Sequence, residues 1–220
     1  MVPDAAQATW IAVVGSDAAG DAVVALVAGR DVAAQAQASH ALIDLTKRAS
    51  TLDFTGVKAQ RVLSGDKVAS AIRDYLLIGA LLTAAEAVGS TSACLAGIVD
   101  YLKTRKQFGK LIGSFQALKH PTVDIYVGME HSRSLVYHAS SEIDDGPLSA
   151  EAEVACRMAK AKASDTIQYA GDRSVQFHGG FGFTWECDSS LFIRRAAWSQ
   201  QQFGDAMHHR KRLAPLLLDA

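Results

Sequence analysis

The sequence predicts a mainly α-helical protein, in which a bundle of four long helices follows a small, partial antiparallel β-sheet. Two observations predict this. The first 65 residues contain short apolar runs that are rich in β-branched residues and separated by turn residues, a pattern typical of strands. From Asp66 onward, apolar residues recur every three to four positions, which is the period of a helix. We therefore expect a partial β-domain over residues 1–65 and a helical bundle over residues 66–220.

The first element is predicted to be a β-hairpin. Apolar residues fill positions 9–14 and 22–27, and the polar segment 16–21 between them has turn chemistry. Two further short runs, 41–45 and 51–62, are expected to complete a four-stranded sheet, with Gly56 at a bend. Such a small sheet leaves one face and one edge open, so it is expected to pack against something else.

The first two helices are predicted over residues 66–103 and 114–143. No proline interrupts the first, and its small residues at 84–90 would allow close packing of a neighbouring helix. Pro121 must lie in the first turns of the second helix or kink it. The segment 144–147, which contains glycine and proline, ends this helix.

The remaining helices are predicted over residues 149–177 and 189–203, with a short helix over 207–218. Ser149 is placed to cap the first of these at its N-terminus. Gly204 separates the last two. Long helices joined by short loops indicate an antiparallel bundle.

The composition excludes several classes of protein. Hydrophobic residues make up 49% of the chain and charged residues 20%, which supports a packed core. A net charge of −1 argues against a nucleic-acid-binding surface. We expect no membrane span and no signal peptide, because we find no apolar run of sufficient length and no basic n-region. Three widely spaced cysteines show neither disulfide nor metal-ligand spacing, so a cytoplasmic protein is expected.

Three clusters of glycine, aromatic and polar residues lie at predicted helix ends. They are residues 105–109 after the first helix, Phe115 with Gln116 before the second, and residues 176–183 after the third. Taken singly, each fits an ordinary helix end, because glycine commonly caps a helix and a basic residue there complements the helix dipole.

Taken together, in this order and spacing, the clusters resemble the C-terminal helical domain of the acyl-CoA dehydrogenases. The resemblance begins at Asp66, and residues 2–61 are similar to the second half of the family's middle β-domain. The variant sequence at 178–186, with His208 and His209 further on, resembles an actinobacterial branch. Members of that branch often act on sterol-derived and other bulky acyl-CoA thioesters, so a role in fatty-acid or steroid degradation is expected.

The resemblance implies an FAD shared between two subunits, with this chain contributing to the nucleotide half of a partner's site. An arginine can fork onto phosphate oxygens, a glutamine can donate and accept, and a Gly-Gly backbone lets a ligand approach closely. The residues implied in cofactor binding are Arg105, Gln107, Phe108, Phe115, Gln116, Gln176, Gly179 and Gly180.

This chain departs from the family at the catalytic base. The position where most members carry a catalytic glutamate is Phe203, and the alternative position on the first helix is Gly79. Phenylalanine and glycine cannot accept a proton. The family residues that touch the subunit's own flavin fall on Asp205 and Met207, which are poor matches. The family's N-terminal helical domain and the flavin-contacting loop of its β-domain have no counterpart in this sequence.

Glu86 is the first candidate for a replacement base, with Asp205 as the other. Glu86 lies two helical turns beyond Gly79 on the same face, where a carboxylate could act as a base or form an ion pair inside the bundle. We favour the structural role, and so assign no catalytic residue to this chain. Adjacent His208 and His209 point in different directions along a helix, so no metal site is expected. Arg194 and Arg195 are expected on a solvated face, with phosphate binding as the alternative.

These features favour a non-catalytic subunit of a heteromeric acyl-CoA dehydrogenase. A full-length partner subunit would supply the base and most of the acyl-CoA site, in an α2β2 assembly that passes electrons to an electron-transfer flavoprotein. Two alternatives stay open: a self-sufficient minimal enzyme that uses Glu86 or Asp205 as its base, and a flavin-free scaffold. The resemblance fits both a natural short subunit and a piece of a longer chain.

Overall fold

The chain folds into two compact units, Met1–Tyr75 and Leu76–Ala220. The computed structural model describes residues 2–33 and 37–218. The division between the units falls inside helix α2 (Asp66–Thr104). The domain boundary expected between residues 65 and 66 stays a prediction, and it coincides with the start of α2.

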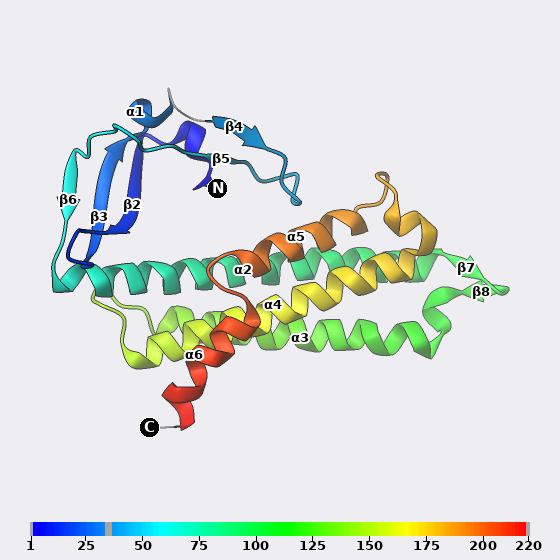
Figure 1. Ribbon diagram of the computed structural model, residues 1–220. Helices are drawn as coiled ribbons and strands as arrows, with labels where there is room; N and C mark the ends of the chain where they lie inside the picture. The colour runs from blue at the N-terminus through cyan, green and yellow to red at the C-terminus, as the bar shows by residue number, and fades with distance from the viewer. Residues whose placement is uncertain (1, 34–36, 219–220) are drawn as a thin grey trace. The chain divides into compact units, whose positions relative to one another are not determined.

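The first unit contains two three-stranded antiparallel sheets, with the strand orders β1-β5-β4 and β2-β3-β6 (Figure 1). The predicted hairpin is confirmed, because β2 and β3 pair in register from Trp10↔Ala28 to Ser16↔Ala22. The Asp17 carboxylate holds its turn by accepting the Ala19 and Asp21 amides at 2.9 and 3.0 Å. The elements of this unit are β1 (Val2–Pro3), η1 (Ala5–Gln7), β2 (Trp10–Ser16), β3 (Ala22–Ala28), α1 (Gly29–Ala33), β4 (Gln37–His40), β5 (Ala49–Thr51) and β6 (Arg61–Leu63).

The expected single four-stranded sheet is wrong, and so are two of its strands. No strand covers residues 41–45; the Asp44 carboxylate there accepts the Thr46 amide at 3.0 Å and folds the backbone into a turn. In the run 51–62 only the ends are strands, because Asp53 accepts the Thr55 amide at 2.9 Å and Gly56 has a φ of 75°. In both runs, an aspartate side chain that accepts a nearby backbone amide favours a turn over a strand.

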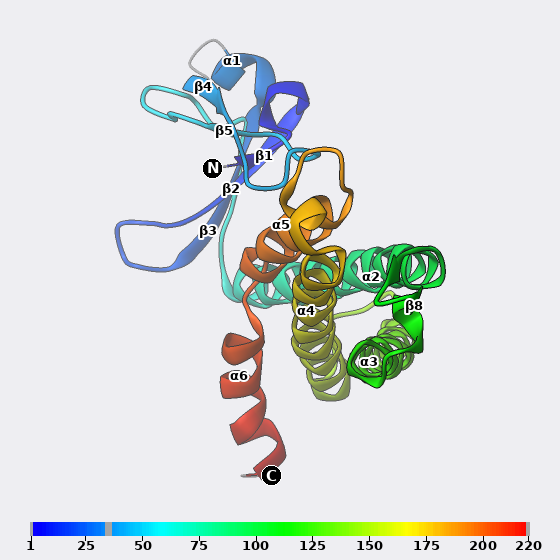
Figure 2. The same cartoon turned by 90° about the vertical axis from the view of Figure 1, so that its right-hand side faces the viewer.

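The second unit is a helical bundle arranged around α4, against which α3, α5 and α6 pack (Figures 1 and 2). The mainly α-helical fold is confirmed, and the predicted helices agree with the structure to within a few residues. Pro121 lies in the second turn of α3, as expected. The elements are the rest of α2, β7 (Lys106–Gln107), β8 (Lys110–Leu111), η2 (Ile112–Ser114), α3 (Gln116–Ser141), α4 (Ala150–His178), η3 (Gly179–Phe183), α5 (Ser189–Gln201) and α6 (Ala206–Leu218).

Small residues bring the helices of this bundle close together. Its larger core cluster joins four helices through residues such as Ala84 of α2, Val136 of α3, Ala159 of α4 and Ala196 of α5. At Gly171 of α4, a Cβ atom would lie 2.9 Å from the Cα of Ile193 on α5. A side chain at this glycine would therefore push α5 away.

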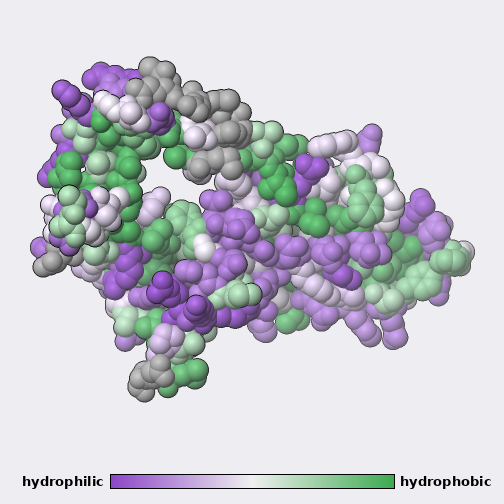
Figure 3. Space-filling model, in the orientation of Figure 1, coloured by the Kyte–Doolittle hydropathy of each residue, from purple (hydrophilic) through white to green (hydrophobic). Residues whose placement is uncertain are grey.

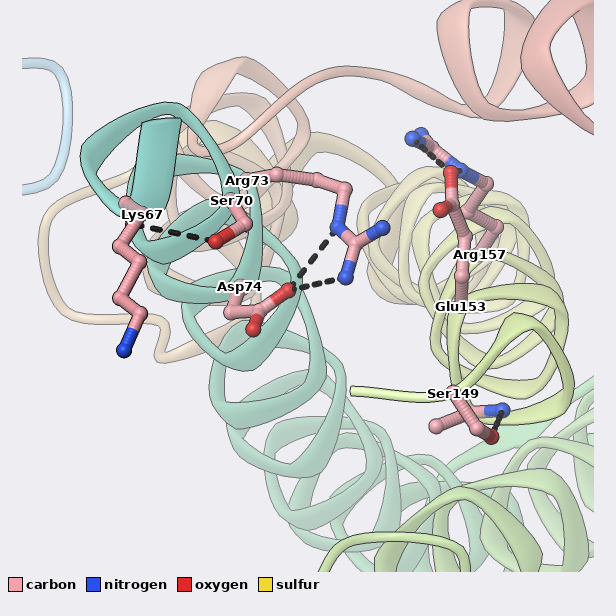
Figure 4. Close-up of polar contacts among 8 residues, drawn as sticks. Lys67, Ser70, Arg73, Asp74, Ser149, Glu153 and Arg157 are labelled. Atoms are coloured by element: carbon pink, nitrogen blue, oxygen red, sulfur yellow. Dashed lines mark hydrogen bonds and ion pairs between the residues drawn. The ribbon is translucent and has the colours of Figure 1, made fainter. Parts of the chain in front are cut away.

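The N-terminus of α4 is capped as the sequence predicts. The Ser149 hydroxyl accepts the Ala152 amide at 3.0 Å, and one turn later Arg157 donates to Glu153 at 2.8 Å (Figure 4). Separately, at the start of α2, the Ser70 hydroxyl donates to the Lys67 carbonyl at 3.0 Å, and Arg73 pairs with Asp74 (Figure 4). The Ser149 cap satisfies one of the free amides at the start of α4 and so fixes where that helix begins.

The segment Lys67–Thr104 is long and apolar enough, by length and composition, to span a membrane. The expectation that no apolar segment is long enough is wrong for this helix, because a window of 18 residues in it has a mean hydropathy of 1.5 with no more than two charged residues. The core helix of a soluble protein passes the same test, so this is weak support for a membrane span. Ala80, Ala84 and Ile98 of this helix are fully buried in the structure.

Candidate functional site

Phe203 and Gly79, the two positions to which the resemblance assigns the family's base, lie directly against each other. The ring of Phe203, in the turn between α5 and α6, packs on Gly79 of α2 so closely that a Cβ atom at Gly79 would lie 2.5 Å from Cζ and 2.6 Å from Cδ1. Real Cβ atoms essentially never approach a neighbour this closely. The ring therefore occupies the space that a side chain at residue 79 would need, and neither position carries a carboxylate.

The two alternative bases are committed to structural contacts. Arg195 of α5 donates to the Glu86 carboxylate of α2 at 2.8 Å, so Glu86 forms the ion pair that its structural role predicts. The Asp205 carboxylate accepts the His208 amide at 2.7 Å and caps α6. Met207 is exposed.

A cavity of about 700 Å³ opens at one end of the second unit, where α2 and α4 end and α3 begins. Its walls include six of the eight predicted cofactor-binding residues: Arg105, Gln107, Phe108, Phe115, Gly179 and Gly180. Gln116 and Gln176 are exposed at the start of α3 and in the last turn of α4, outside the lining. The remaining lining residues are Tyr101, Ile112, Leu118, Phe177, His178 and Phe181.

A tight hairpin forms one wall of this cavity. Strands β7 and β8 pair through Gln107↔Lys110. The two residues between them, Phe108 and Gly109, have φ values of 53° and 77°, as a type I′ turn requires. A phenylalanine in this conformation is uncommon, and its ring is 91% exposed. It makes an edge contact with Phe115, whose ring also lies 4.3 Å from the Lys110 ammonium.

The opposite wall is built from the end of α4. His178 stacks on Tyr101 with ring centroids 4.1 Å apart, and its Nδ1 lies 2.8 Å from the Ser174 carbonyl oxygen. Gly179 ends the helix with a φ of 61°, and no atom lies within 4 Å of where a Cβ would be at Gly179 or Gly180. A ligand can therefore approach this backbone directly.

The charges around the cavity suit an anion. Arg105 is exposed and forms no ion pair within the described residues. Phe115, at the N-cap of α3, supplies no side-chain cap, and the Leu118 amide donates to the Phe115 carbonyl at 3.1 Å, so the amides of Gln116 and Ala117 are left for water or a ligand. The solvated face expected for Arg194 and Arg195 is wrong for Arg195, which is half-buried in its pair with Glu86, and Arg194 lies 4.6 Å from the ring of Trp185. No group of three or more potential metal-ligating side chains was found among the described residues.

The sequence clusters did not single out Tyr101 and His178 as site residues. His178 stands within the cluster 176–183, whereas Tyr101 lies four residues before Arg105, and their stack joins the end of α2 to the end of α4. The space-filling view in Figure 3 shows apolar atoms at the end of the helical unit that carries β7 and β8, beside polar ones. Exposed aromatic residues are numerous here and include Phe108, Phe181, Phe183 and Trp185.

Comparison with known proteins identifies the family. The profile described as "Acyl-CoA dehydrogenase, C-terminal domain" matches residues 69–215, and the chain belongs to the acyl-CoA dehydrogenase family. It is 38% identical over 134 residues to acyl-CoA dehydrogenase IpdE2 of Mycolicibacterium smegmatis, covering 61% of this chain and 40% of that protein. It is 40% identical over 122 residues to IpdE2 of Mycobacterium tuberculosis, covering 56% of this chain and 36% of the relative.

Solved structures share the fold over nearly the whole chain. The glutaryl-coenzyme A dehydrogenase complex with glutaryl-CoA matches with a TM-score of 0.87 and 24% identity, covering 99% of this chain and 56% of that one. The ChsE4-ChsE5 complex from Mycobacterium tuberculosis matches with a TM-score of 0.81 and 23% identity, covering 97% of this chain and 56% of that one. The chain thus spans about two fifths of the IpdE2 relatives and under three fifths of these solved chains.

Proposed function

We propose that this chain is a non-catalytic subunit of a heteromeric acyl-CoA dehydrogenase and completes the FAD site of a partner subunit. The contact between Phe203 and Gly79 carries the proposal, because it fills the place of the family's base with an aromatic ring. Glu86 and Asp205 are engaged in an ion pair and a helix cap. Neither residue 79 nor residue 203 therefore supplies a carboxylate that could abstract a proton.

The cavity at the ends of α2 and α4 supports a role in nucleotide binding. When bound, FAD supplies the hydride acceptor for desaturation of an acyl-CoA. Arg105 and the first amides of α3 would hold its phosphates, since both favour negative charge. Phe108 and Phe115 would pack against the flat parts of the nucleotide, and the open backbone at Gly179 and Gly180 would allow close approach.

The partner in this proposal is a full-length acyl-CoA dehydrogenase subunit that carries its own base and acyl-CoA site, in an α2β2 assembly. The exposed aromatic residues beside the cavity fit such an interface, because large apolar side chains left in water favour burial against another protein. A shared-fold complex of two different proteins, ChsE4-ChsE5, supports a heteromeric arrangement. The substrate class we propose is a bulky, sterol-derived acyl-CoA, and the electron acceptor an electron-transfer flavoprotein.

Co-expression with such a partner tests the proposal. The chain alone, the partner alone and the two together are purified, and bound FAD is measured from the visible flavin spectrum. We expect stable flavin and acyl-CoA desaturation only in the complex. Flavin and activity in the chain alone would establish the self-sufficient enzyme instead. If the partner binds the same amount of flavin with and without this chain, the chain is a flavin-free scaffold.

A further inference from the structure

A buried polar cluster lies away from the cavity, around the turn between α5 and α6. We call Lys160, Ser199, Phe203 and His209 the turn cluster. The side chains of Lys160, Ser199 and His209 are almost completely buried, at 1%, 1% and 2% residue exposure. The Lys160 ammonium on α4 donates to the Ser199 carbonyl and to the Ser164 hydroxyl, each at 2.9 Å.

His209 of α6 holds the other side of the same turn. Its Nε2 lies 3.0 Å from the Phe203 carbonyl oxygen. A carbonyl oxygen can only accept, so Nε2 carries the proton and Nδ1 is left with its lone pair. Nδ1 is buried without a hydrogen-bond partner among the described residues. The Lys160 ammonium thus bonds a carbonyl in the last turn of α5, and the His209 imidazole bonds a carbonyl within the turn that follows.

The turn that they grip is in a conformation that needs support. Phe203 has a φ of 55° and Gly204 a φ of 96°. A phenylalanine in the left-handed region is unfavourable and persists where its surroundings fix it. A Cβ atom at Gly204 would lie 2.6 Å from the His208 ring, so α6 closes tightly on the turn. The Phe203 ring is directed at Gly79 by this backbone.

We propose that Lys160 and His209 are positioning residues that hold Phe203 on Gly79, and that protonation of His209 releases the turn. The charged groups facing His209 are Lys160 and Arg157 from α4 and His208 from α6, with the Asp205 carboxylate of the turn near Lys160. A protonated His209 adds a buried positive charge beside Lys160 and Arg157, while the Asp205 carboxylate acts on Lys160. The inference depends neither on a flavin nor on a partner.

The protonation chemistry of both groups agrees with this arrangement. Burial, assisted by the charge of Lys160, lowers the pKa of His209 to about 4, although the hydrogen bond to the Phe203 carbonyl favours the protonated form and partly offsets that shift. Burial lowers the pKa of Lys160 to about 8, and the nearby Asp205 carboxylate partly offsets that shift. At neutral pH the cluster therefore holds a neutral imidazole and a charged ammonium. The bond to the Phe203 carbonyl needs only Nε2–H, which imidazolium also carries, so the release comes from the added buried charge beside Lys160 and not from loss of this donor.

Fluorine NMR of the full chain, labelled with fluorophenylalanine, tests the release. The Phe203 signal is identified by its loss in Phe203→Leu, and the pH is lowered through about 4, with circular dichroism recorded in parallel. We expect the Phe203 signal to change with a midpoint near 4 while helicity is retained. His209→Gln, which keeps an N–H donor but cannot be charged, should abolish this step, and the exposed neighbour variant His208→Gln should keep it. The same step in His209→Gln would overturn the proposal.

A second experiment has one readout, the tautomer of His209, that needs no acid. Long-range ¹H–¹⁵N NMR at neutral pH reports which nitrogen of His209 carries the proton. We expect Nε2–H, and we expect Lys160→Met to raise the midpoint of His209 by removing the neighbouring positive charge. A proton on Nδ1 would overturn the proposal, because the grip on the Phe203 carbonyl would not exist. If Lys160→Met leaves the titration midpoint of His209 unchanged, Lys160 has no part in the release of the turn.

Discussion

Phe203 and Gly79 are far apart in the sequence, yet the ring of one covers the Cα of the other, and a Cβ at Gly79 would lie 2.5 Å from the ring's Cζ. Members of the family carry a catalytic glutamate at one of two positions. By resemblance, these positions correspond to Phe203 and Gly79 in this chain. Here each substitution accommodates the other: glycine makes room for the ring, and the ring fills the space of a carboxylate. One contact, the Phe203 ring against Gly79, therefore accounts for the missing carboxylate at both positions.

Gly79→Ala should destabilise the helical unit by about 1–3 kcal/mol, because the added methyl group overpacks against Phe203. Phe203→Ala in the same chain should remove much of that added cost. Gly89→Ala is the matched control on the same helix, since nothing lies within 4 Å of its Cβ position; it should stabilise α2 slightly. Denaturant unfolding measures all four proteins. Equal effects at residues 79 and 89 would contradict the packing described here.

Arg105→Ala should weaken flavin binding to the assembled complex by about 1.5–3 kcal/mol, the usual range for a hydrogen bond to a charged group. Gln116→Ala should act in the same direction but less, because Gln116 lies outside the lining of the cavity. Lys103→Ala, two residues before Arg105 and also outside the lining, is the control. Flavin dissociation constants provide the comparison. Full flavin affinity after both substitutions would remove this surface from the FAD site.

Glu86→Gln should leave desaturation by the complex nearly intact, because Glu86 is the ion-pair partner of Arg195. The expected cost is a loss of stability through the weakened pair. Steady-state turnover and flavin content are measured together. A fall in turnover of about 10²–10⁴, the usual cost of removing a general base, with unchanged flavin would mean that Glu86 is catalytic after all.

Phe203→Glu restores a carboxylate to the family position but should create no second active site. The new side chain would enter a turn held by Lys160 and His209, opposite the backbone of Gly79. Burial would keep it protonated or cost stability. Initial rates of the complex with and without this substitution test the point, and a rate that doubles would show that an acyl-CoA reaches residue 203.

The free energy of unfolding should rise with pH between about 4 and 6.5 through His209. Its folded pKa lies below its unfolded value, so the unfolded chain binds more protons in this window and stability falls as the pH drops. His209→Gln should flatten this part of the profile. Urea unfolding at several pH values measures the slope. If the free energy of unfolding of His209→Gln keeps the same pH dependence, groups other than His209 cause it.

The helices could be predicted because their apolar period and caps are local signals. The same holds for the β2–β3 hairpin, whose turn is fixed by Asp17. The run 41–45 was predicted wrongly because the turn centred on Asp44 outweighs a short apolar run. In the cavity, the motifs predicted six lining residues, whereas the Tyr101–His178 stack depends on tertiary packing between two helix ends. Lys160 could not be singled out, since a lysine in a helix looks solvated until the packing of α5 is known.

The central claim is that this chain lends a surface to a flavin site but supplies no base. The most direct test is to replace the partner's catalytic carboxylate with its amide, in a complex with this chain unaltered, and to measure acyl-CoA desaturation at unchanged flavin content. The account predicts that turnover falls by about 10²–10⁴, as expected when the only general base is removed. Substantial residual turnover that is then abolished by Glu86→Gln would contradict it.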